Sequence, residues 1–387
     1  MKVLHINANY LYTNLHQCMS RALTEQGVDN QVFVPICSGD NLVVTPDENV
    51  VVCECLRKWY RVWFYGKQRK IRKALEAEIS VGQFDILHAY TLFTDGNCAY
   101  ELSKKYGVPY VVAVRNTDVN IFFKWMPHLR SRGVEILANA KAVFFMSETY
   151  KNHVLNNYVP AALQGVLEAK AYVIPNGIDD FWHENLEAKE RKNCNDPVKL
   201  VFAGRVDANK NITTTQAVMR VLRDRGYQTH LTVVGKVADK AVFDRIVRDE
   251  HTTYIPPKDK SELIQIYRDN DIFVMPSHTE TFGLVYVEAM GQGLPVIYTK
   301  GQGFDGQFPE GQVGYHVDDH NAEDVADGIQ KVIKEYGEIS TRCINNIDKF
   351  RWMSICETYQ SIYRNVCGVH NENEENLRYY QRLSNQG

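Results

Sequence analysis

The feature that most constrains the fold of this 387-residue chain is a regular alternation of short apolar runs with helix-forming stretches. In the first half, the apolar runs predict seven strands, at residues 3–6, 31–34, 50–53, 85–88, 110–114, 142–146 and 172–174. Such alternation is typical of a parallel sheet whose two faces are covered by helices. The sequence therefore predicts an α/β fold.

The same rhythm restarts in the second half, which indicates a second domain of the same kind. Six further strands are predicted, at residues 199–203, 230–234, 253–255, 272–275, 296–298 and 314–317. The turn Pro175-Asn-Gly-Ile-Asp179 and the polar stretch 184–197 lie between the halves and are interpreted as a hinge and linker. We expect Rossmann-like domains at 1–178 and 179–350, facing each other across a cleft at the carboxyl ends of their strands.

Charge and composition exclude several classes of protein. A net charge of −3 argues against bulk nucleic-acid binding, for which a basic domain would be expected. No run of about 20 apolar residues is present, and the first residues form a strand pattern without a signal-peptide cleavage site. The nine cysteines include no C-x-x-C pair, which favours reduced thiols over disulfides or a zinc site. These observations predict a cytoplasmic protein.

Two glutamates, Glu280 and Glu288, flank the predicted start of a helix that follows a buried strand. Glu280 lies in the loop at the carboxyl end of the strand, and Glu288 lies about one and a half turns into the helix. The first N–H groups of that helix suit an anion such as a phosphate, and Gly283 lets the ligand approach the backbone. Two carboxylates beside a phosphate site suit the hydroxyls of a sugar nucleotide.

Two cations occupy the corresponding place after the first strand of the second domain. Arg205 and Lys210 follow that strand and precede a helix that begins near Ile212. Fixed cations ahead of a helix N-terminus form an anion site. The alternative is a pair of loop cations without a ligand.

The spacing of Glu280 and Glu288 resembles the E-x7-E signature of the retaining family 4 glycosyltransferases, which have the GT-B fold. Three more stretches are similar to motifs of that family: the hinge 175–179, the G-R-x4-K loop within 199–211, and an aromatic-spaced segment that begins at Phe350-Arg-Trp352 and includes Tyr359 and Tyr363. The last of these resembles a C-terminal helix that crosses back to the first domain, within 351–387. The resemblance covers most of the second half and is patchier in the first.

The resemblance implies specific roles for residues of the second half. Arg205 and Lys210 would bind the donor diphosphate, Glu280 the donor sugar and Glu288 the ribose. Other donor contacts are implied at Gly204, Thr281, Phe282, Gly283 and Leu284. Glu280 is not expected to be a covalent nucleophile, since retaining enzymes of this fold generally lack a carboxylate so placed. The donor would be a UDP- or GDP-sugar, and neither a metal nor another cofactor is expected.

Sugar or acceptor contacts are expected in the first half, after two of its strands. The family often has H-G-x-D where this chain has Arg115 and Asn116 followed by Asp118. Asp118 is either an acceptor contact or a helix N-cap. The loop 7–13, where the family usually has a glycine pair, contains no glycine, and its Asn9 and Tyr10 could hydrogen-bond a sugar or a phosphate. His88 ends a strand similar to the family's D-[IV]-[VI]-H pattern and is interpreted as a structural histidine.

Three motifs of other protein classes occur by chance, in our interpretation. The G-x-G-x-x-G of residues 301–306 is followed by Pro309 and opens no helix, so it predicts no nicotinamide site. The D-x-D of residues 269–271 precedes a buried strand and is read as surface acids. The metal-ligand residue types of residues 316–320 would be split across the two faces of a strand by its alternation.

The stretch from Leu56 to Lys73 carries eight Arg or Lys, five aromatics and no acid. A basic aromatic helix suits the surface of an anionic membrane. The alternative is a helix whose aromatics pack on the sheet while its cations are solvated. A nucleic-acid patch ranks third, because the rest of the chain is not basic.

These observations together predict a metal-independent hexosyltransferase of cell-surface polysaccharide biosynthesis. It would move a sugar with retention from a nucleotide sugar to a glycan or lipid-linked acceptor. Peripheral association with the inner face of the cell membrane is an option that the basic aromatic stretch leaves open. Rival hypotheses are a sugar-nucleotide epimerase, a glycosyl phosphorylase, or a catalytically silent sugar-nucleotide-binding protein. The segment 369–387 is left unassigned.

Overall fold

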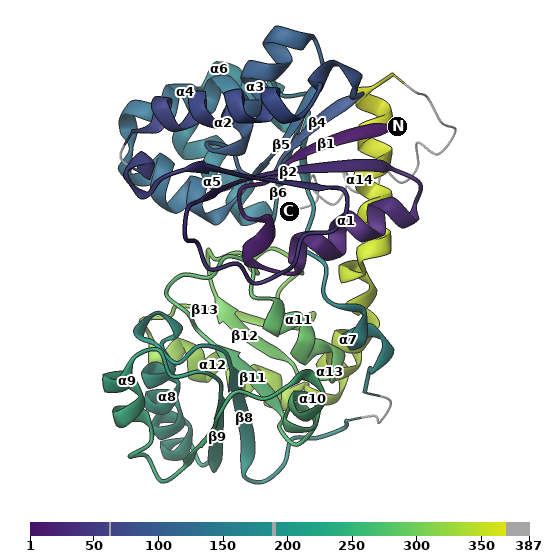
Figure 1. Ribbon diagram of the computed structural model, residues 1–387. Helices are drawn as coiled ribbons and strands as arrows, with labels where there is room; N and C mark the ends of the chain where they lie inside the picture. The colour runs from purple at the N-terminus through teal and green to yellow at the C-terminus, as the bar shows by residue number, and fades with distance from the viewer. Residues whose placement is uncertain (62, 188–190, 369–387) are drawn as a thin grey trace. The chain divides into compact units, whose positions relative to one another are not determined.

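The computed structural model describes residues 1–61, 63–187 and 191–368. They divide into two compact units, which are Met1–Gly177 with Trp352–Gly387, and Ile178–Arg351 (Figure 1). The unassigned segment 369–387 lies outside the described residues. None of the helices in the described ranges is long and apolar enough to cross a membrane.

The first unit is built on a seven-stranded sheet in which every pair of neighbours is parallel. Its strands are β1 (Lys2–Ile6), β2 (Asp29–Cys37), β3 (Val50–Leu56), β4 (Ile86–Ala89), β5 (Tyr110–Val114), β6 (Ala142–Phe145) and β7 (Ala171–Val173). Their order is β3-β2-β1-β4-β5-β6-β7, so the winding direction reverses between β1 and β4. β5 is buried along its whole length, as a central strand covered on both faces should be.

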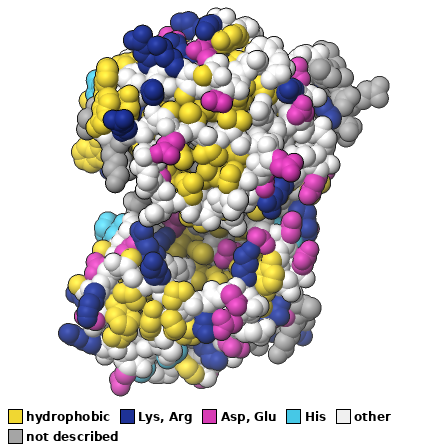
Figure 2. Space-filling model, in the orientation of Figure 1, with side chains coloured by type: hydrophobic (Ala, Val, Ile, Leu, Met, Phe, Trp, Pro, Cys, Tyr) yellow, Lys and Arg dark blue, Asp and Glu magenta, His cyan; other side chains and the backbone are white. Residues whose placement is uncertain are grey.

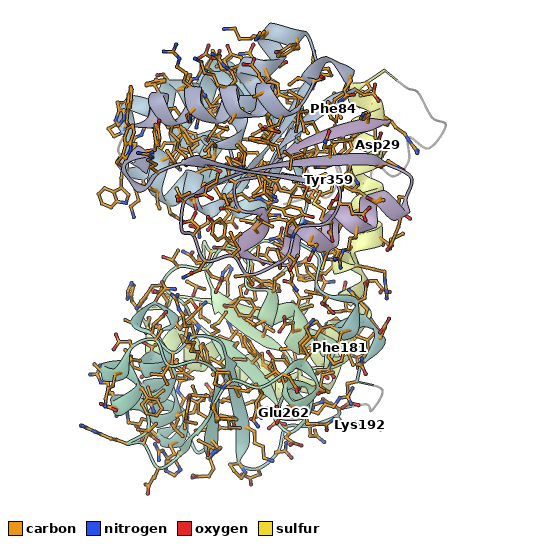
Figure 3. The ribbon with its side chains drawn as sticks, viewed as in Figure 1. Asp29, Phe84, Phe181, Lys192, Glu262 and Tyr359 are labelled. Carbon is orange, nitrogen blue, oxygen red and sulfur yellow. The ribbon has the colours of Figure 1, made fainter. Side chains whose placement is uncertain are left out.

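Helices cover both faces of this sheet. They are η1 (Tyr10–Tyr12), α1 (Leu15–Glu25), η2 (Lys58–Arg61), α2 (Phe64–Glu78), η3 (Val81–Gln83), α3 (Asp95–Tyr106), η4 (Asp118–Phe123), α4 (Pro127–Asn139), α5 (Glu148–Tyr158), α6 (Ala161–Glu168) and α14 (Trp352–Val366). The C-terminal α14 packs beside α1 and returns the chain to the first unit (Figure 1). Tyr359 projects from α14 toward the sheet, where its ring meets Phe144 edge-on (Figure 3).

The second unit repeats the architecture with a six-stranded parallel sheet. Its strands are β8 (Val198–Ala203), β9 (Thr229–Val234), β10 (Thr252–Ile255), β11 (Ile272–Met275), β12 (Val296–Thr299) and β13 (Gly314–Val317). Its helices are α7 (Asp180–Glu184), η5 (Ala208–Lys210), α8 (Ile212–Asp224), α9 (Lys240–Ile246), α10 (Lys260–Arg268), α11 (Leu284–Gly291), α12 (Ala322–Lys334), α13 (Tyr336–Asn345) and η6 (Ile347–Phe350). The order β10-β9-β8-β11-β12-β13 reverses between β8 and β11.

All thirteen strands predicted from the sequence are present, with bounds that shift by a few residues at most in either direction, and the α/β class with two parallel sheets is confirmed. Local chemistry explains why several helices begin where they do. Side chains at the N-cap positions of α5, α7, α9, α10 and α12 accept backbone N–H groups of the first turn, as such caps usually do. These caps are Ser147, Asp179, Asp239, Asp259 and Asn321.

The basic aromatic stretch forms η2 and α2, except that Val62 lies outside the described residues. Tyr60 and Phe64 pack against the main core of the first unit, whereas Trp59, Trp63 and Tyr65 are at least half exposed. Figure 2 shows hydrophobic side chains beside Lys and Arg side chains on the visible face of this unit. The alternative in which the aromatics pack on the sheet therefore holds for two of the five and is wrong for the other three.

Candidate active site

The reversal in strand order between β8 and β11 marks where a ligand of the second unit should bind. In doubly wound sheets the loops after two such strands diverge, which leaves a crevice at the carboxyl ends. The loop after β8 leads through Gly204 and Arg205 to η5, and the loop after β11 leads through Glu280 to α11. The predicted cations and Glu280 therefore belong to neighbouring loops at one edge of one sheet, and Glu288 lies on the helix that follows the second loop.

The loop after β8 presents its two cations in different ways. Arg205 is largely exposed, and its Nε donates to an Asp207 carboxylate oxygen 2.6 Å away. The other Asp207 oxygen accepts the backbone N–H of Lys210 at 3.2 Å and thereby caps η5. One aspartate thus fixes both the loop and the orientation of Arg205.

Lys210 and Glu280 form an ion pair across the two loops, with Nζ 2.5 Å from Oε2. Both side chains are mostly shielded from water, since 17% of Lys210 and 13% of Glu280 is exposed. The second oxygen of Glu280 accepts the backbone N–H of Thr281 at 3.0 Å. The structure therefore brings together two of the residues that the resemblance assigns to the donor.

Two asparagines that sequence reasoning missed hold these loops in place. The Asn209 side chain exchanges hydrogen bonds with both backbone groups of Thr279, at 2.9 and 3.1 Å. Asn211 is buried in the left-handed conformation, with φ 54°, and its amide donates to the carbonyls of Pro276 and Asp319. Asparagine tolerates that backbone region better than most residues do, so the residue type at position 211 was the only hint that the sequence offered.

The glycine-rich loop 301–306 packs against the Glu280 loop. The backbone N–H of Gly303 donates to the Glu280 carbonyl at 3.1 Å, and the Gln302 side chain accepts the Glu280 N–H at 2.9 Å. A Cβ on Gly303 would lie 1.7 Å from the Thr281 carbonyl oxygen. No helix follows this loop, in agreement with the prediction that it is not a nicotinamide fingerprint.

The start of α11 offers backbone N–H groups at the same edge of the sheet. Gly283 precedes the helix in the left-handed conformation, with φ 79°, which glycine adopts without steric cost. Phe282 is buried, and the Tyr286 hydroxyl donates to the Met275 carbonyl at 2.6 Å, which fixes the helix to the end of β11. First-turn N–H groups have no partner within their helix and carry partial positive charge, so they suit a phosphate.

Glu288 lies on α11 beside a second ion pair, between Lys260 and Asp179 at 2.5 Å. Burial raises the pKa of Glu288 to about 7, while the positive charge of Lys260 lowers it and the negative charge of Asp179 raises it further. At neutral pH a carboxyl group with a pKa near 7 can donate a hydrogen bond to a hydroxyl when it is protonated, or accept one from it when it is ionised. This agrees with the ribose contact that the resemblance implies.

The raised pKa of Glu288 leads to a prediction about the pH dependence of folding stability. Above the ordinary pKa of 4.5 the unfolded chain has lost the Glu288 proton, whereas the folded protein keeps it up to about pH 7. The contribution of Glu288 to folding stability should therefore fall as pH rises from about 4.5 to about 7. We expect Glu288→Gln to unfold at a higher temperature than the wild type at pH 8, with the difference shrinking at pH 5. Asp95 and Asp118 titrate in the same range, so the comparison with the variant isolates Glu288; an unchanged difference across pH would contradict the assignment.

In the first unit, the structure places Asn9 and Tyr10 after β1. Asn9 is exposed, and its backbone N–H donates to the Asn7 side chain at 2.9 Å. Tyr10 is 1% exposed and belongs to a small apolar cluster with Leu11 and neighbours on β2. Its ring serves the core, so Asn9 is the better placed of the two for a sugar contact, which stays a prediction.

Asp118 holds two loops of the first unit together. Its carboxylate accepts the backbone N–H groups of Leu92 and Phe93, at 2.9 and 3.1 Å, and of Arg115 at 2.9 Å. Asp118 lies inside η4, after the N-cap position at Thr117, so the helix-cap alternative is wrong. Asp118 is 1% exposed, and burial raises its pKa to about 6. Its role as an acceptor contact stays a prediction.

Arg115 and Asn116, which follow β5, are tied to other elements of the first unit. The Arg115 guanidinium donates to the Tyr90 carbonyl at 3.4 Å and to the Asn176 side chain at 3.1 Å. The Asn116 amide donates to the Tyr150 hydroxyl at 3.3 Å. Both side chains are partly exposed, and their role toward a sugar or an acceptor stays a prediction.

Two other sequence interpretations can be compared with the structure. His88 is fully buried, with its Nδ1 2.5 Å from the Tyr363 hydroxyl, and burial holds its pKa well below the ordinary value. A structural role for this histidine is consistent with that environment. Asp271 is 1% exposed and accepts N–H groups of Asn195 and Lys199 at the amino end of β11, on the opposite edge of the sheet from the cations. The interpretation of residues 269–271 as surface acids is therefore wrong for Asp271, although Asp269 is exposed.

The prediction that strand alternation separates the metal-ligand residue types of residues 316–320 is only partly right. His316 and His320 do fall into different groups of side chains. However, β13 ends at Val317, so the alternation of a strand does not apply to Asp319 and His320. These two residues lie in the following loop and join His278 from the loop after β11.

Comparison with known proteins agrees with this architecture. The family model for "Glycosyl transferases group 1" matches residues 184–350, and that for "Glycosyltransferase Family 4" matches residues 17–180. The chain is 26% identical over 358 residues to a D-inositol 3-phosphate glycosyltransferase of Pseudarthrobacter chlorophenolicus, covering 84% of this chain and 81% of the relative. It is 25% identical over 237 residues to the capsular polysaccharide biosynthesis glycosyltransferase CapM of Staphylococcus aureus, covering 58% and 61%.

Two solved structures share the fold. Sucrose-phosphate synthase of Thermosynechococcus elongatus aligns with a TM-score of 0.73 at 17% identity, covering 96% of this chain and 100% of that one. HepE of Anabaena, solved with UDP and glucose, aligns with a TM-score of 0.65 at 15% identity, covering 94% and 100%. The two sheets and their helices thus define a GT-B protein. The chain belongs to the family 4 glycosyltransferases, also described as glycosyl transferases group 1.

Proposed function

We propose that this glycosyltransferase moves a hexose from a nucleotide diphosphate sugar to an acceptor hydroxyl with retention of configuration. The observation that carries the proposal is the meeting of Lys210 and Glu280 beside the start of α11, with Arg205 on the adjoining loop. This arrangement supplies positive charge for a diphosphate and a carboxylate for sugar hydroxyls at one edge of one sheet.

The chemistry follows from where charge develops. The bond between the anomeric carbon and the phosphate oxygen breaks, while a bond forms from the acceptor oxygen to that carbon on the same face of the sugar. The leaving diphosphate takes the acceptor proton. Arg205, Lys210 and the first turn of α11 stabilise the leaving group most in the transition state. Glu280 is engaged by Lys210 and by the Thr281 N–H, which suits binding of sugar hydroxyls better than nucleophilic attack.

The donor that we propose, as the family resemblance implies, is a UDP- or GDP-sugar, with Glu288 on the ribose and Gly204, Thr281 and Leu284 lining the site. The acceptor would be a glycan or a lipid-linked sugar of cell-surface polysaccharide biosynthesis, bound by the first unit. Support comes from the relative CapM, a capsular polysaccharide biosynthesis glycosyltransferase, and from the HepE structure, which was solved with UDP and glucose. Asn9, Arg115 and Asn116 are the candidate acceptor or sugar contacts of the first unit.

A panel of nucleotide sugars tests the proposal and separates its rivals. We expect one donor to release its nucleoside diphosphate in the presence of a glycan acceptor. An epimerase would interconvert the sugar without releasing the diphosphate, and a phosphorylase would consume free phosphate as the acceptor. A silent binding protein would bind a donor and turn over none. Any of these three results would refute glycosyl transfer.

Transfer should survive an excess of chelator, since Arg205 and Lys210 supply the charge that a divalent ion provides in other transferases. We expect the rate in EDTA to stay within about threefold of the untreated rate, because loss of even one essential charge donor would cost far more. The measurement is diphosphate release before and after dialysis against the chelator. Full loss of activity, restored by Mg²⁺ or Mn²⁺, would refute the metal-independent mechanism.

We also propose that η2 and α2 bind an anionic membrane surface. Trp59, Trp63 and Tyr65 are exposed, and the exposed cations Arg69, Lys70 and Lys73 lie on α2. Each cation near such a surface contributes on the order of 1 kcal/mol. Replacing the three cations with Gln should reduce co-sedimentation with anionic vesicles, most strongly at low salt.

The matched control is a triple Gln variant of the exposed cations Lys240, Arg245 and Arg248 on the second unit. It removes the same charge and should leave vesicle binding unchanged. Equal sedimentation of the wild type and the α2 variant at low salt would show that these cations are simply solvated.

A further inference from the structure

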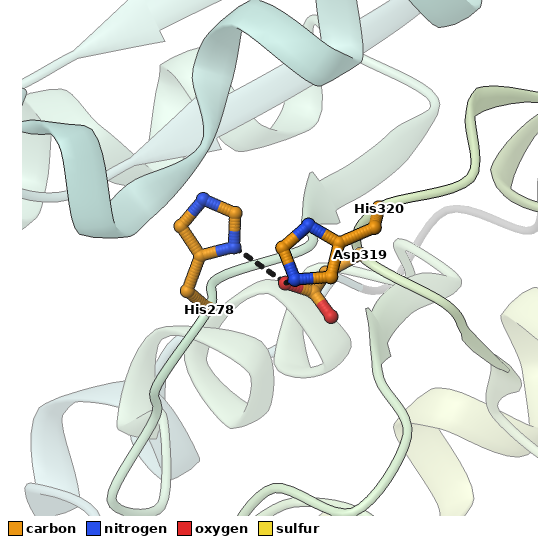
Figure 4. A group of neighbouring side chains, drawn as sticks. All are labelled: His278, Asp319 and His320. Atoms are coloured by element: carbon orange, nitrogen blue, oxygen red, sulfur yellow. Dashed lines mark hydrogen bonds and ion pairs between the residues drawn. The ribbon is translucent and has the colours of Figure 1, made fainter.

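A group of metal-ligating side chains lies on the second unit beside the candidate active site. His278 comes from the loop after β11, and Asp319 and His320 come from the loop after β13 (Figure 4). One nitrogen of each histidine and one oxygen of Asp319 all lie within 4.8 Å of one another. We propose that these three side chains bind a divalent transition-metal ion, with Zn²⁺ the best fit.

The distances suit an ion at the centre of the group. His278 Nδ1 is 2.5 Å from Asp319 Oδ2, and His320 Nε2 is 3.5 Å from the same oxygen. Ligands placed about 2.0–2.1 Å from Zn²⁺ in a tetrahedron are about 3.3 Å apart. An ion would therefore spread the first pair by less than 1 Å and leave the second almost unchanged. The fourth position would be taken by water or another ligand.

The donor set selects the class of ion. Two imidazoles with one carboxylate suit Zn²⁺, Co²⁺ or Ni²⁺, whereas Mg²⁺ and Ca²⁺ prefer oxygen ligands. The two imidazole rings face each other with centroids 5.0 Å apart and an angle of 22° between their planes. The Asp319 side chain, only 15% exposed, lies against both rings.

The backbone that carries two of the three ligands, His278 and Asp319, is held by hydrogen bonds without an ion. The His278 N–H donates to the Asn209 carbonyl at 2.9 Å, and the Asn211 amide donates to the Asp319 carbonyl at 2.7 Å. Both anchors belong to the junction of η5 and α8, next to Lys210. Binding therefore requires only side-chain rotations, which is the arrangement that favours a tight site.

A second group on the same unit, formed by Asp305, Glu310 and His316, is a weaker candidate. It has one imidazole, and its single Nδ1 already contacts both carboxylates, at 2.9 and 3.1 Å. The carboxylates are also engaged elsewhere, since Asp305 accepts the Gly301 N–H and Glu310 accepts the His316 N–H. This group serves as an internal control.

The consequence of binding would be a restraint on the candidate active site. His278 precedes Glu280 by two residues, so an ion would tie the Glu280 loop to the loop after β13. The ion would restrain a loop and would take no part in the transfer step. Such a role is compatible with the prediction that transfer survives an excess of chelator. The site itself is inferred without reference to the transferred sugar.

Calorimetric titration of the chelator-treated whole chain with Zn²⁺ tests the inference. We expect a site that is weakened at least about tenfold in His278→Gln, Asp319→Asn and His320→Gln. His316→Gln and the exposed His128→Gln, on α4, should bind as the wild type does. Because nine cysteines could bind Zn²⁺ adventitiously, titration with Co²⁺ should show a tetrahedral visible spectrum without a near-ultraviolet thiolate band.

Thermal unfolding separates binding from damage to the fold. Without metal, the three ligand variants should unfold within a few degrees of the wild type, and only the wild type and the controls should gain stability from Zn²⁺. Equal Zn²⁺ binding by all variants would show that His278 and Asp319 are a hydrogen-bonded surface pair only. Loss in His316→Gln alone would move the site to the other group. Zn²⁺ binding without diphosphate release from any donor would refute the proposed function and leave this inference standing.

Discussion

Replacement of either fixed cation, Arg205→Ala or Lys210→Ala, should lower kcat/KM by about 10²–10³-fold while the protein stays folded. Loss of one oriented donor for developing charge typically costs about 3–4 kcal/mol of transition-state stabilisation. Both side chains project from one short segment after β8, where Asp207 holds Arg205 and caps η5. The measurement is the rate of nucleoside diphosphate release with the verified donor.

The two cations should differ in a second respect. Lys210→Ala also leaves the mostly shielded Glu280 carboxylate without its ion-pair partner, so Lys210→Ala should weaken donor binding more than Arg205→Ala does. Lys240→Ala is a matched control, because Lys240 is exposed on α9 of the same unit and pairs only loosely with Asp244. Near-normal rates in both site variants would contradict the assignment of the diphosphate site.

Gly303→Ala should lower kcat/KM by about 10²-fold without unfolding the second unit. A Cβ at this position would lie 1.7 Å from the Thr281 carbonyl oxygen, so the glycine-rich loop must move away from the Glu280 loop by more than 1 Å. A misplacement of that size at a reacting centre typically costs about two orders of magnitude in rate. The rate should be measured alongside the circular dichroism spectrum.

Gly82→Ala is the control for this substitution. Gly82 lies in η3 of the first unit, and a Cβ there would meet no heavy atom within 4 Å. Its rate should match the wild type. A Gly303→Ala enzyme with the wild-type rate would show that the loop 301–306 does not set the position of Glu280.

The strands could be predicted from the sequence because each is a short apolar run bounded by polar or glycine-containing turns. β5, β11 and β13 match their predicted bounds, although β5 and β11 are buried along their whole length and β13 is only partly buried. The order of the strands is a different matter. Hydrophobic pattern does not say which strands are neighbours, and that order decides which loops meet.

The second-unit site could be predicted in outline for the same reason that its fold could. Arg205 and Glu280 follow strands that end at the same edge of one sheet, so their approximate proximity follows from the parallel arrangement. The Lys210–Glu280 ion pair depends on side-chain positions that no local pattern fixes. Residue type and position after a strand were enough to locate the site of the second unit. The ion pair within it could be identified only from the three-dimensional structure.

The residues that were missed or misread depend on contacts between distant parts of the chain. Asn211 joins loops 65 and 108 residues away, so its role leaves no local signature beyond a left-handed asparagine. Tyr10 was predicted to contact a ligand, but its ring is buried by the neighbouring strand β2. His278 and Asp319 are 41 residues apart in sequence, and the short motif near His320 gave no indication of the partner.

The central claim is that the second unit binds a nucleoside diphosphate through Arg205, Lys210 and the start of α11. Titration of the whole chain with UDP, GDP and the corresponding monophosphates tests it most directly, since we propose that these cations bind the phosphate that a monophosphate lacks. One diphosphate should bind at least about tenfold more tightly than its monophosphate, and Lys210→Ala should abolish that preference, because a charged hydrogen bond contributes about 1.5–3 kcal/mol. Equal affinity for both nucleotides, or a preference that persists in Lys210→Ala, would contradict the account.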